Sequence, residues 1–133
     1  MPPKGTDLIE RIRAGSLLPP THFANLYCDT ILNARDSDPA FEREWSAARK
    51  DLEARWKASR PNRAAQAIVE DLRRESFLAV STATSQHELA SYVSDDFELI
   101  AWASAVGDVP PVVAWLWDSY DTGAIPRPDR RST

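Results

Sequence analysis

The residue types that most often carry out catalysis are sparse in this chain and are not grouped. It contains two histidines, His22 and His87, and one cysteine, Cys28. A nucleophilic cysteine needs a histidine within hydrogen-bonding reach. His22 is six residues from Cys28, which places the two far apart around a helix. A pair between Cys28 and His87 would have to be assembled by the fold, so Cys28 is predicted to be a small, buried thiol.

Segments that resemble metal or phosphate sites are incomplete. Residues 87–91 begin like a zinc-protease helix, but Ser91 stands where the second histidine ligand is required. Asp36, Asp38 and Glu42 lack the glycine and the final glutamate of a calcium-binding loop. The four glycines are isolated and none is closely followed by lysine, which excludes a phosphate-binding loop. The sequence therefore predicts no metal, no cofactor and no enzymatic activity.

Acidic residues are concentrated in the C-terminal part of the chain. The whole chain has 20 acidic and 16 basic residues, a formal net charge of -4. Segment 76–126 contains no lysine or arginine but seven acidic residues, namely Glu88, Asp95, Asp96, Glu98, Asp108, Asp118 and Asp121. Such a segment is expected to repel nucleic acid and to attract a basic protein.

A structural explanation competes with this one, since acidic residues also stabilise the starts of helices and keep a protein soluble. It suits Asp95 and Asp96, which follow Ser94 directly. It does not suit Asp118 and Asp121, because both fall in the second half of a predicted helix, where negative charge is unfavourable.

Tryptophans accompany these acids. Three of the five tryptophans, Trp102, Trp115 and Trp117, lie in the same segment. On a helical wheel Trp117 faces inward, whereas Trp102 and Trp115 fall at the boundary or face solvent. An exposed tryptophan beside carboxylates is typical of binding hot spots. The predicted partner-binding residues are therefore Glu98, Trp102, Trp115, Asp118 and Asp121. Packing of Trp115 against another helix is the alternative.

Helical signals occur along nearly the whole chain, and ten prolines separate its apolar-periodic runs. The sequence predicts an all-α fold, with a single compact domain over 1–126 and a disordered basic tail over 127–133. Six to seven helices are expected: 7–14, one from Thr21 to Ala34, 39–59, one from 61 or 62 to about 81, 86–93, 95–106 and 111–122. Their predicted caps include Asp38, Ser94 and a capping box that starts at Ser85.

Other features of the sequence indicate the compartment in which the protein acts. The lone cysteine is what a reducing compartment permits. No stretch approaches the ~18 apolar residues of a membrane span, and no apolar signal core follows the first residues. A cytoplasmic protein that contacts neither membrane nor nucleic acid is expected. The oligomeric state is left open.

In composition and charge layout, though in no single motif, the chain resembles small acidic proteins that inhibit basic nucleases or other toxins, the immunity proteins and antitoxins. The resemblance implies a non-enzymatic inhibitor that captures a basic protein partner through its acidic, tryptophan-containing C-terminal half. Two alternatives remain. One is a self-assembling helical scaffold or adaptor subunit, and the other is a small enzyme or ligand-binding domain that uses Cys28 or His87.

Overall fold

The computed structural model describes residues 1–23 and 26–131. Within these residues the chain forms six α-helices, two short 3-10 helices and no strand, which confirms the predicted all-α fold. The helices are α1 (Gly5–Arg13), α2 (Cys28–Asp36), α3 (Pro39–Ala58), α4 (Arg63–Thr84), α5 (His87–Val106) and α6 (Pro111–Asp121), and the 3-10 helices are η1 (Pro20–Phe23) and η2 (Pro128–Arg130).

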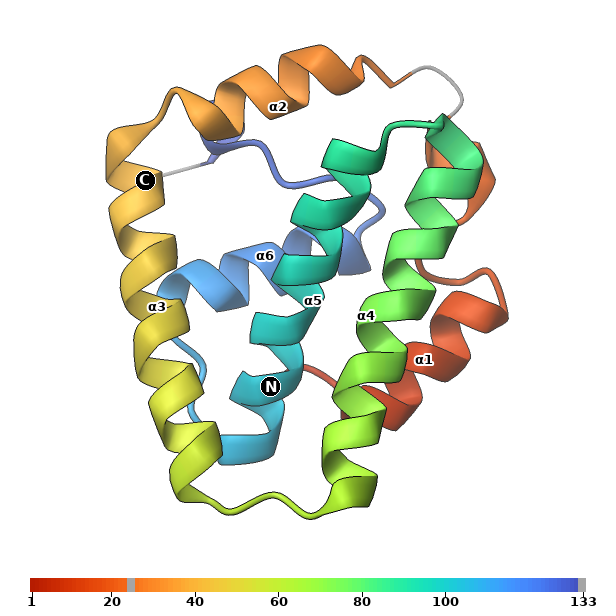
Figure 1. Cartoon of the computed structure of the whole chain (residues 1–133). Coiled ribbons are helices and arrows are strands. Elements are labelled where there is room, and N and C mark those ends of the chain that lie inside the picture. The colour runs from red at the N-terminus through yellow and green to blue at the C-terminus, as the bar shows by residue number, and fades with distance from the viewer. Residues whose placement is uncertain (24–25, 132–133) are drawn as a thin grey trace.

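Helix α5 is the centre of the fold. It packs against α4, α3, α2 and α6, and in Figure 1 it runs between α3 and α4, with α2 crossing above them and α6 behind. Twelve of its twenty residues are buried. A helix that is buried on nearly all sides has no single inner stripe. The helical wheel for this segment therefore misplaced Trp102, which is buried.

Helix α3 begins where its local sequence predicts. The Asp38 carboxylate accepts a hydrogen bond of 3.0 Å from the backbone N–H of Phe41, and Pro39 occupies the first helical position, where its missing N–H costs nothing. Similarly, Asn62 accepts from the N–H of Ala65 at the start of α4. These two caps fix the N-terminal ends of α3 and α4.

We expect Asp38→Ala to lower the free energy of unfolding by about 1 kcal/mol, because the N–H of Phe41 loses its acceptor. Asp38→Asn is the control, since its side-chain oxygen can still cap the helix. Urea unfolding followed by circular dichroism measures both variants. Wild-type stability of Asp38→Ala would contradict the role of this cap.

Two predicted helix boundaries are wrong. The predicted break at Ser94 does not exist, because α5 is continuous from His87 to Val106 and the Ser94 hydroxyl instead donates to the carbonyl oxygen of Arg73 on α4. The predicted capping box at Ser85 is also absent. Ser85 ends α4 in a left-handed conformation (φ 57°), and Gln86 precedes α5 without a side-chain capping bond.

Segment 20–36 also differs from the single helix predicted from Thr21. The structure has η1 up to Phe23 and a separate helix α2 from Cys28, whereas residues 24 and 25 of the predicted helix lie outside the described residues. At the other end, Arg131 forms an ion pair of 2.7 Å with Glu44 of α3, while the disorder of the tail over 127–133 stays a prediction. Residues 132 and 133 of the predicted tail also lie outside the described residues.

No single helix in the described part of the chain is long and apolar enough to cross a membrane. Helices α5 and α6 meet the length and composition criteria only together, across a break at which their axes differ by 115°.

Candidate functional site

Most of the acids in segment 76–126 are paired with arginines from earlier helices. Arginines lie within 3.1 Å of five of the seven carboxylates: Arg35 with Asp96, Arg49 and Arg73 with Glu98, Arg73 with Asp95, Arg55 with Asp108, and Arg11 with Asp121. Only Glu88 and Asp118 have no ion pair among the described residues. The expectation that segment 76–126 carries uncompensated negative charge is therefore wrong for five of its seven acids.

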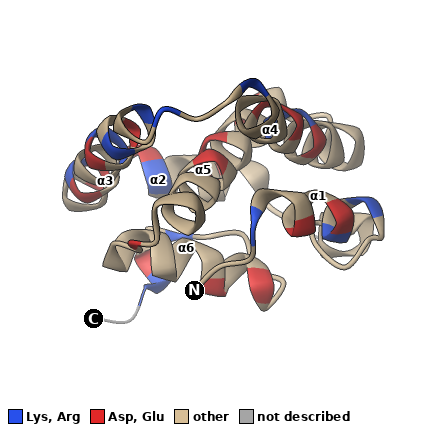
Figure 2. Cartoon of the chain, turned by 90° about the horizontal axis from the view of Figure 1, so that it is seen from below, with Lys and Arg blue, Asp and Glu red and all other residues tan. Residues whose placement is uncertain are grey.

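The physical reason is that charge was counted along the chain, whereas charges interact in space. Helix α5 carries four of the seven acids, and α3 and α4 carry arginines on both sides of it. Figure 2 shows an acidic segment of α5 between α3 and α4, which carry charges of both signs. Contacts between residues about 20 to 60 positions apart neutralise three of these four acids, Asp95, Asp96 and Glu98.

The best-connected of these carboxylates is Asp96, whose side chain is fully buried. It accepts two hydrogen bonds from Arg35 (2.6 and 2.8 Å), one from the Trp45 indole N–H (3.0 Å) and one from the Tyr120 hydroxyl (2.6 Å). One carboxylate thus joins α2, α3 and α6 to α5.

The environment of Asp96 alters the titration of its neighbours. Burial lowers the pKa of Arg35, but the charge and hydrogen bonds of Asp96 outweigh it, so the net pKa is raised. Burial raises the pKa of Tyr120 well above its ordinary value, and the Asp96 charge adds to this effect. Arg35 therefore stays charged and Tyr120 stays a neutral donor, as the hydrogen bonds require.

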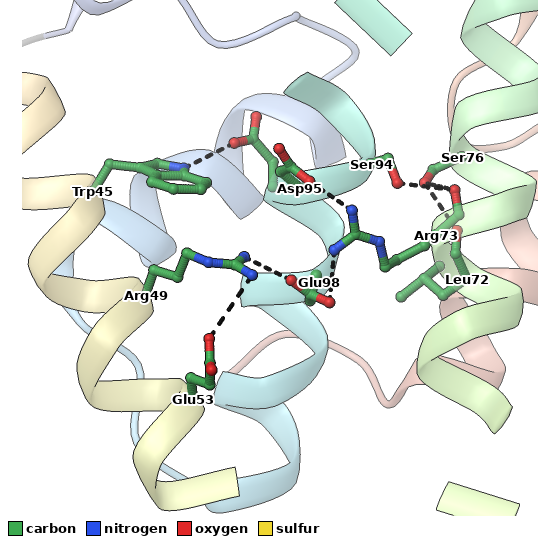
Figure 3. A network of polar contacts seen from close by, with 10 residues as sticks. Trp45, Arg49, Glu53, Leu72, Arg73, Ser76, Ser94, Asp95 and Glu98 are labelled. Carbon is green, nitrogen blue, oxygen red and sulfur yellow. Dashed lines mark hydrogen bonds and ion pairs between the residues drawn. The ribbon is translucent and has the colours of Figure 1, made fainter. Parts of the chain in front are cut away.

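A groove lies between α3 and α4, with α5 as its floor. Figure 3 shows Glu98 of α5 between Arg49 of α3 and Arg73 of α4, and each guanidinium lies 2.6 Å from a different Glu98 oxygen. Below this bridge the groove has a volume of about 530 Å³. Its lining includes Trp56 of α3 and Trp102 of α5 beside charged side chains such as Glu53, so the groove has both apolar and charged walls.

A smaller pocket of about 210 Å³ lies where α2, α3 and α5 meet. Its lining consists of three carboxylates, three aromatic rings and one arginine: Asp36, Glu42, Asp95, Phe41, Trp45, Tyr92 and Arg35. The Tyr92 hydroxyl donates a short hydrogen bond to Asp36, and this bond, with burial, raises the pKa of Tyr92 to about 12. Burial also raises the pKa of Asp95, against the opposing effect of Arg73.

The structure does not bring the predicted partner-binding residues together at one surface. Glu98 and Trp102 belong to the groove and are only 8% and 5% exposed, so the expectation that Trp102 lies at the boundary or faces solvent is wrong. Trp115, Asp118 and Asp121 lie on α6, which in Figure 2 is on the side of α5 away from α3 and α4.

The three residues on α6 differ in exposure. Asp118 and Asp121 are exposed. Trp115 is half-buried, because it packs edge-on against Phe41 at 5.8 Å between ring centroids and lies under the guanidinium of Arg131. Packing of Trp115 against another helix, the alternative considered from the sequence, therefore occurs. Trp117 is buried, as predicted.

The residues of the smaller pocket were not identified from the sequence as a site. Arg35 was not singled out. One local signal was present, since Arg35 follows Ile31 by four residues and Leu32 by three and so shares their buried face. A buried arginine requires an acid from elsewhere in the fold.

The residues considered for catalysis are placed separately. Cys28 is half-buried, and burial raises the pKa of its thiol. His87 is exposed, stacks on Phe77 and forms a hydrogen bond of 2.7 Å with Ser81. Across residues 1–23 and 26–131, no three histidine, cysteine or acidic side chains are grouped so that they could hold a metal ion.

Comparison with known proteins identifies a family for this chain. A family model described as immunity protein PIM1 matches residues 7–127, which include all six α-helices apart from the first two residues of α1. Neither a curated protein nor a solved structure matches the chain.

Proposed function

The chain belongs to the immunity protein PIM1 family, and from this membership we propose that it protects a cell by binding a protein toxin and blocking its action. The match over residues 7–127 is the observation that carries the proposal. Inhibition is stoichiometric and requires no reaction catalysed by the chain. This function agrees with an all-α domain whose charged groups hold its helices together.

We further propose that the bound surface of the toxin is basic. The formal net charge of -4 supports this, as do exposed carboxylates that have no ion pair within the described residues. Asp118 is one of these, on α6, and Asp36 and Glu42 are others, at the pocket between α2, α3 and α5. Attraction between opposite charges speeds association and is weakened by salt.

The test begins with capture of the toxin. The purified chain is used to recover its partner from a lysate of the source cells at low and high salt, and mass spectrometry identifies what is bound. We expect one basic protein, recovered less efficiently at high salt. Expressed alone, that protein should arrest growth, and co-expression of the chain should restore growth.

Two results would contradict the proposal. The captured protein could be harmless when expressed alone, or the chain could fail to restore growth although it is folded and abundant. Recovery of copies of the chain alone would favour the self-assembling scaffold, and sedimentation at several concentrations would then measure that assembly.

A further inference from the structure

We propose that the pocket between α2, α3 and α5 accommodates one arginine side chain from the surface of the toxin. This inference rests on the proposed function, since it names a contact made by the same inhibitor. The pocket, of about 210 Å³, is smaller than the roughly 300–1,000 Å³ of typical small-molecule sites. Its size therefore suits a single side chain.

The charges of the pocket favour a cation. Of its lining residues, Arg35 is neutralised by Asp96 through two hydrogen bonds, and Asp95 is paired with Arg73 at 2.7 Å. Asp36 and Glu42 line the same pocket but have no ion pair in the part of the chain that the structure describes. Two negative charges therefore remain uncompensated, and both side chains are exposed to an approaching partner.

The aromatic lining favours arginine over other cations. Phe41, Trp45 and Tyr92 contribute rings to the pocket, and a planar guanidinium stacks on aromatic faces while it donates to carboxylates. Within the protein, Arg35 already lies over the rings of Phe41 and Tyr92, at 5.2 and 5.4 Å from their centroids. Two of the three rings that line the pocket thus already pack against a guanidinium.

Two details prepare the pocket for binding. The Tyr92 hydroxyl donates to Asp36, which fixes the orientation of one carboxylate before the partner arrives. The Trp45 indole is held by its N–H bond to Asp96, and in Figure 3 it extends from α3 toward α5. Groups that are already oriented lose little conformational entropy on binding.

The first experiment uses a small probe and needs no toxin. Nα-acetylarginine amide is titrated into the 15N-labelled protein, and Nα-acetylcitrulline amide, a neutral compound of nearly the same shape, is the control. We expect saturable shifts of the Trp45 indole N–H signal with the arginine compound only. Equal shifts with both compounds, or none with the arginine compound, would overturn the inference.

A pair of matched variants locates the effect. Asp36→Asn with Glu42→Gln removes the two uncompensated charges, and the asparagine oxygen can still accept from Tyr92. Asp7→Asn with Glu10→Gln removes two exposed charges from α1 and is the control for net charge. The arginine-specific shift should disappear only in the first variant. Should that variant fold poorly, Glu42→Gln alone tests the same point, because no hydrogen bond or ion pair of the described structure involves this side chain.

The captured toxin provides the second test. We expect Asp36→Asn with Glu42→Gln to weaken its affinity about tenfold more than Asp7→Asn with Glu10→Gln does. Equal affinities of the two variants would overturn the arginine pocket while the proposed function stands. If the wild-type chain protects against no toxin but still binds the arginine compound, the proposed function fails and the pocket remains.

Discussion

Asp96→Ala is expected to lower the free energy of unfolding by about 3–5 kcal/mol, the largest effect of any single polar substitution in this protein. The substitution leaves the Arg35 guanidinium, which is only 6% exposed, without a counter-charge. It also removes the acceptor of the Trp45 N–H and of the Tyr120 hydroxyl. Since whole domains are stable by only about 5–15 kcal/mol, urea unfolding should show a large shift of the midpoint.

A surface ion pair provides the control for this prediction. Arg13 and Glu75 lie 3.0 Å apart, but the Arg13 side chain is 58% exposed, so Glu75→Ala should cost less than about 1 kcal/mol. We also expect Arg35→Ala combined with Asp96→Ala to cost less than the sum of the two single changes, because each single change leaves an uncompensated buried group. A cost of Asp96→Ala no larger than that of Glu75→Ala would contradict the central role of Asp96.

Helix boundaries were predicted correctly where the cap is local. Asp38 and Pro39 at the start of α3, and Gly107 in a left-handed conformation (φ 76°) after α5, depend only on neighbouring residues. Ser94 presents the same local signal, but its hydroxyl bonds to the Arg73 carbonyl on α4. A sequence pattern cannot distinguish a serine that caps a helix from one that joins two helices.

The candidate site could be predicted only in part, because its geometry comes from contacts between distant residues. The sequence placed Glu98 and Trp102 on the same predicted helix, and both line the groove. It could not indicate that Arg49 lies against both, at 2.6 Å from the Glu98 carboxylate and 5.2 Å from the Trp102 ring centroid. Because the Arg49 guanidinium covers its ring, Trp102 is buried, although the helical wheel placed it at the boundary of the helix's inner face.

The smaller pocket was missed for a related reason. Asp36, Glu42 and Tyr92 come from three helices and have no shared spacing in the sequence. Asp36 and Glu42 lie in a part of the chain with equal numbers of acidic and basic residues, so the count of charges gave no signal there. Uncompensated charge is a property of the folded arrangement, and the acids that looked unpaired along the chain are largely those that are paired in space.

Glu98→Ala is expected to lower the free energy of unfolding by about 2 kcal/mol, because charged hydrogen bonds from two arginines are lost together. The cost should be smaller than for Asp96→Ala. The Arg49 and Arg73 side chains are 33% and 34% exposed, so both guanidinium groups can turn toward water once the carboxylate is gone. Glu98→Gln retains one acceptor oxygen and should lie between the wild type and the alanine variant.

The matched control is Glu53→Ala. Glu53 also contacts Arg49, at 3.8 Å, but within the same helix and on the protein surface, so its loss should cost less than about 1 kcal/mol. Glu98 of α5, in contrast, pairs with arginines of both α3 and α4 and so links the two walls of the groove to its floor. Amide hydrogen exchange should therefore increase along the facing turns of both α3 and α4 in Glu98→Ala but not in Glu53→Ala. Equal exchange in the two variants would show that α3 and α4 are held in place by apolar packing on α5 alone.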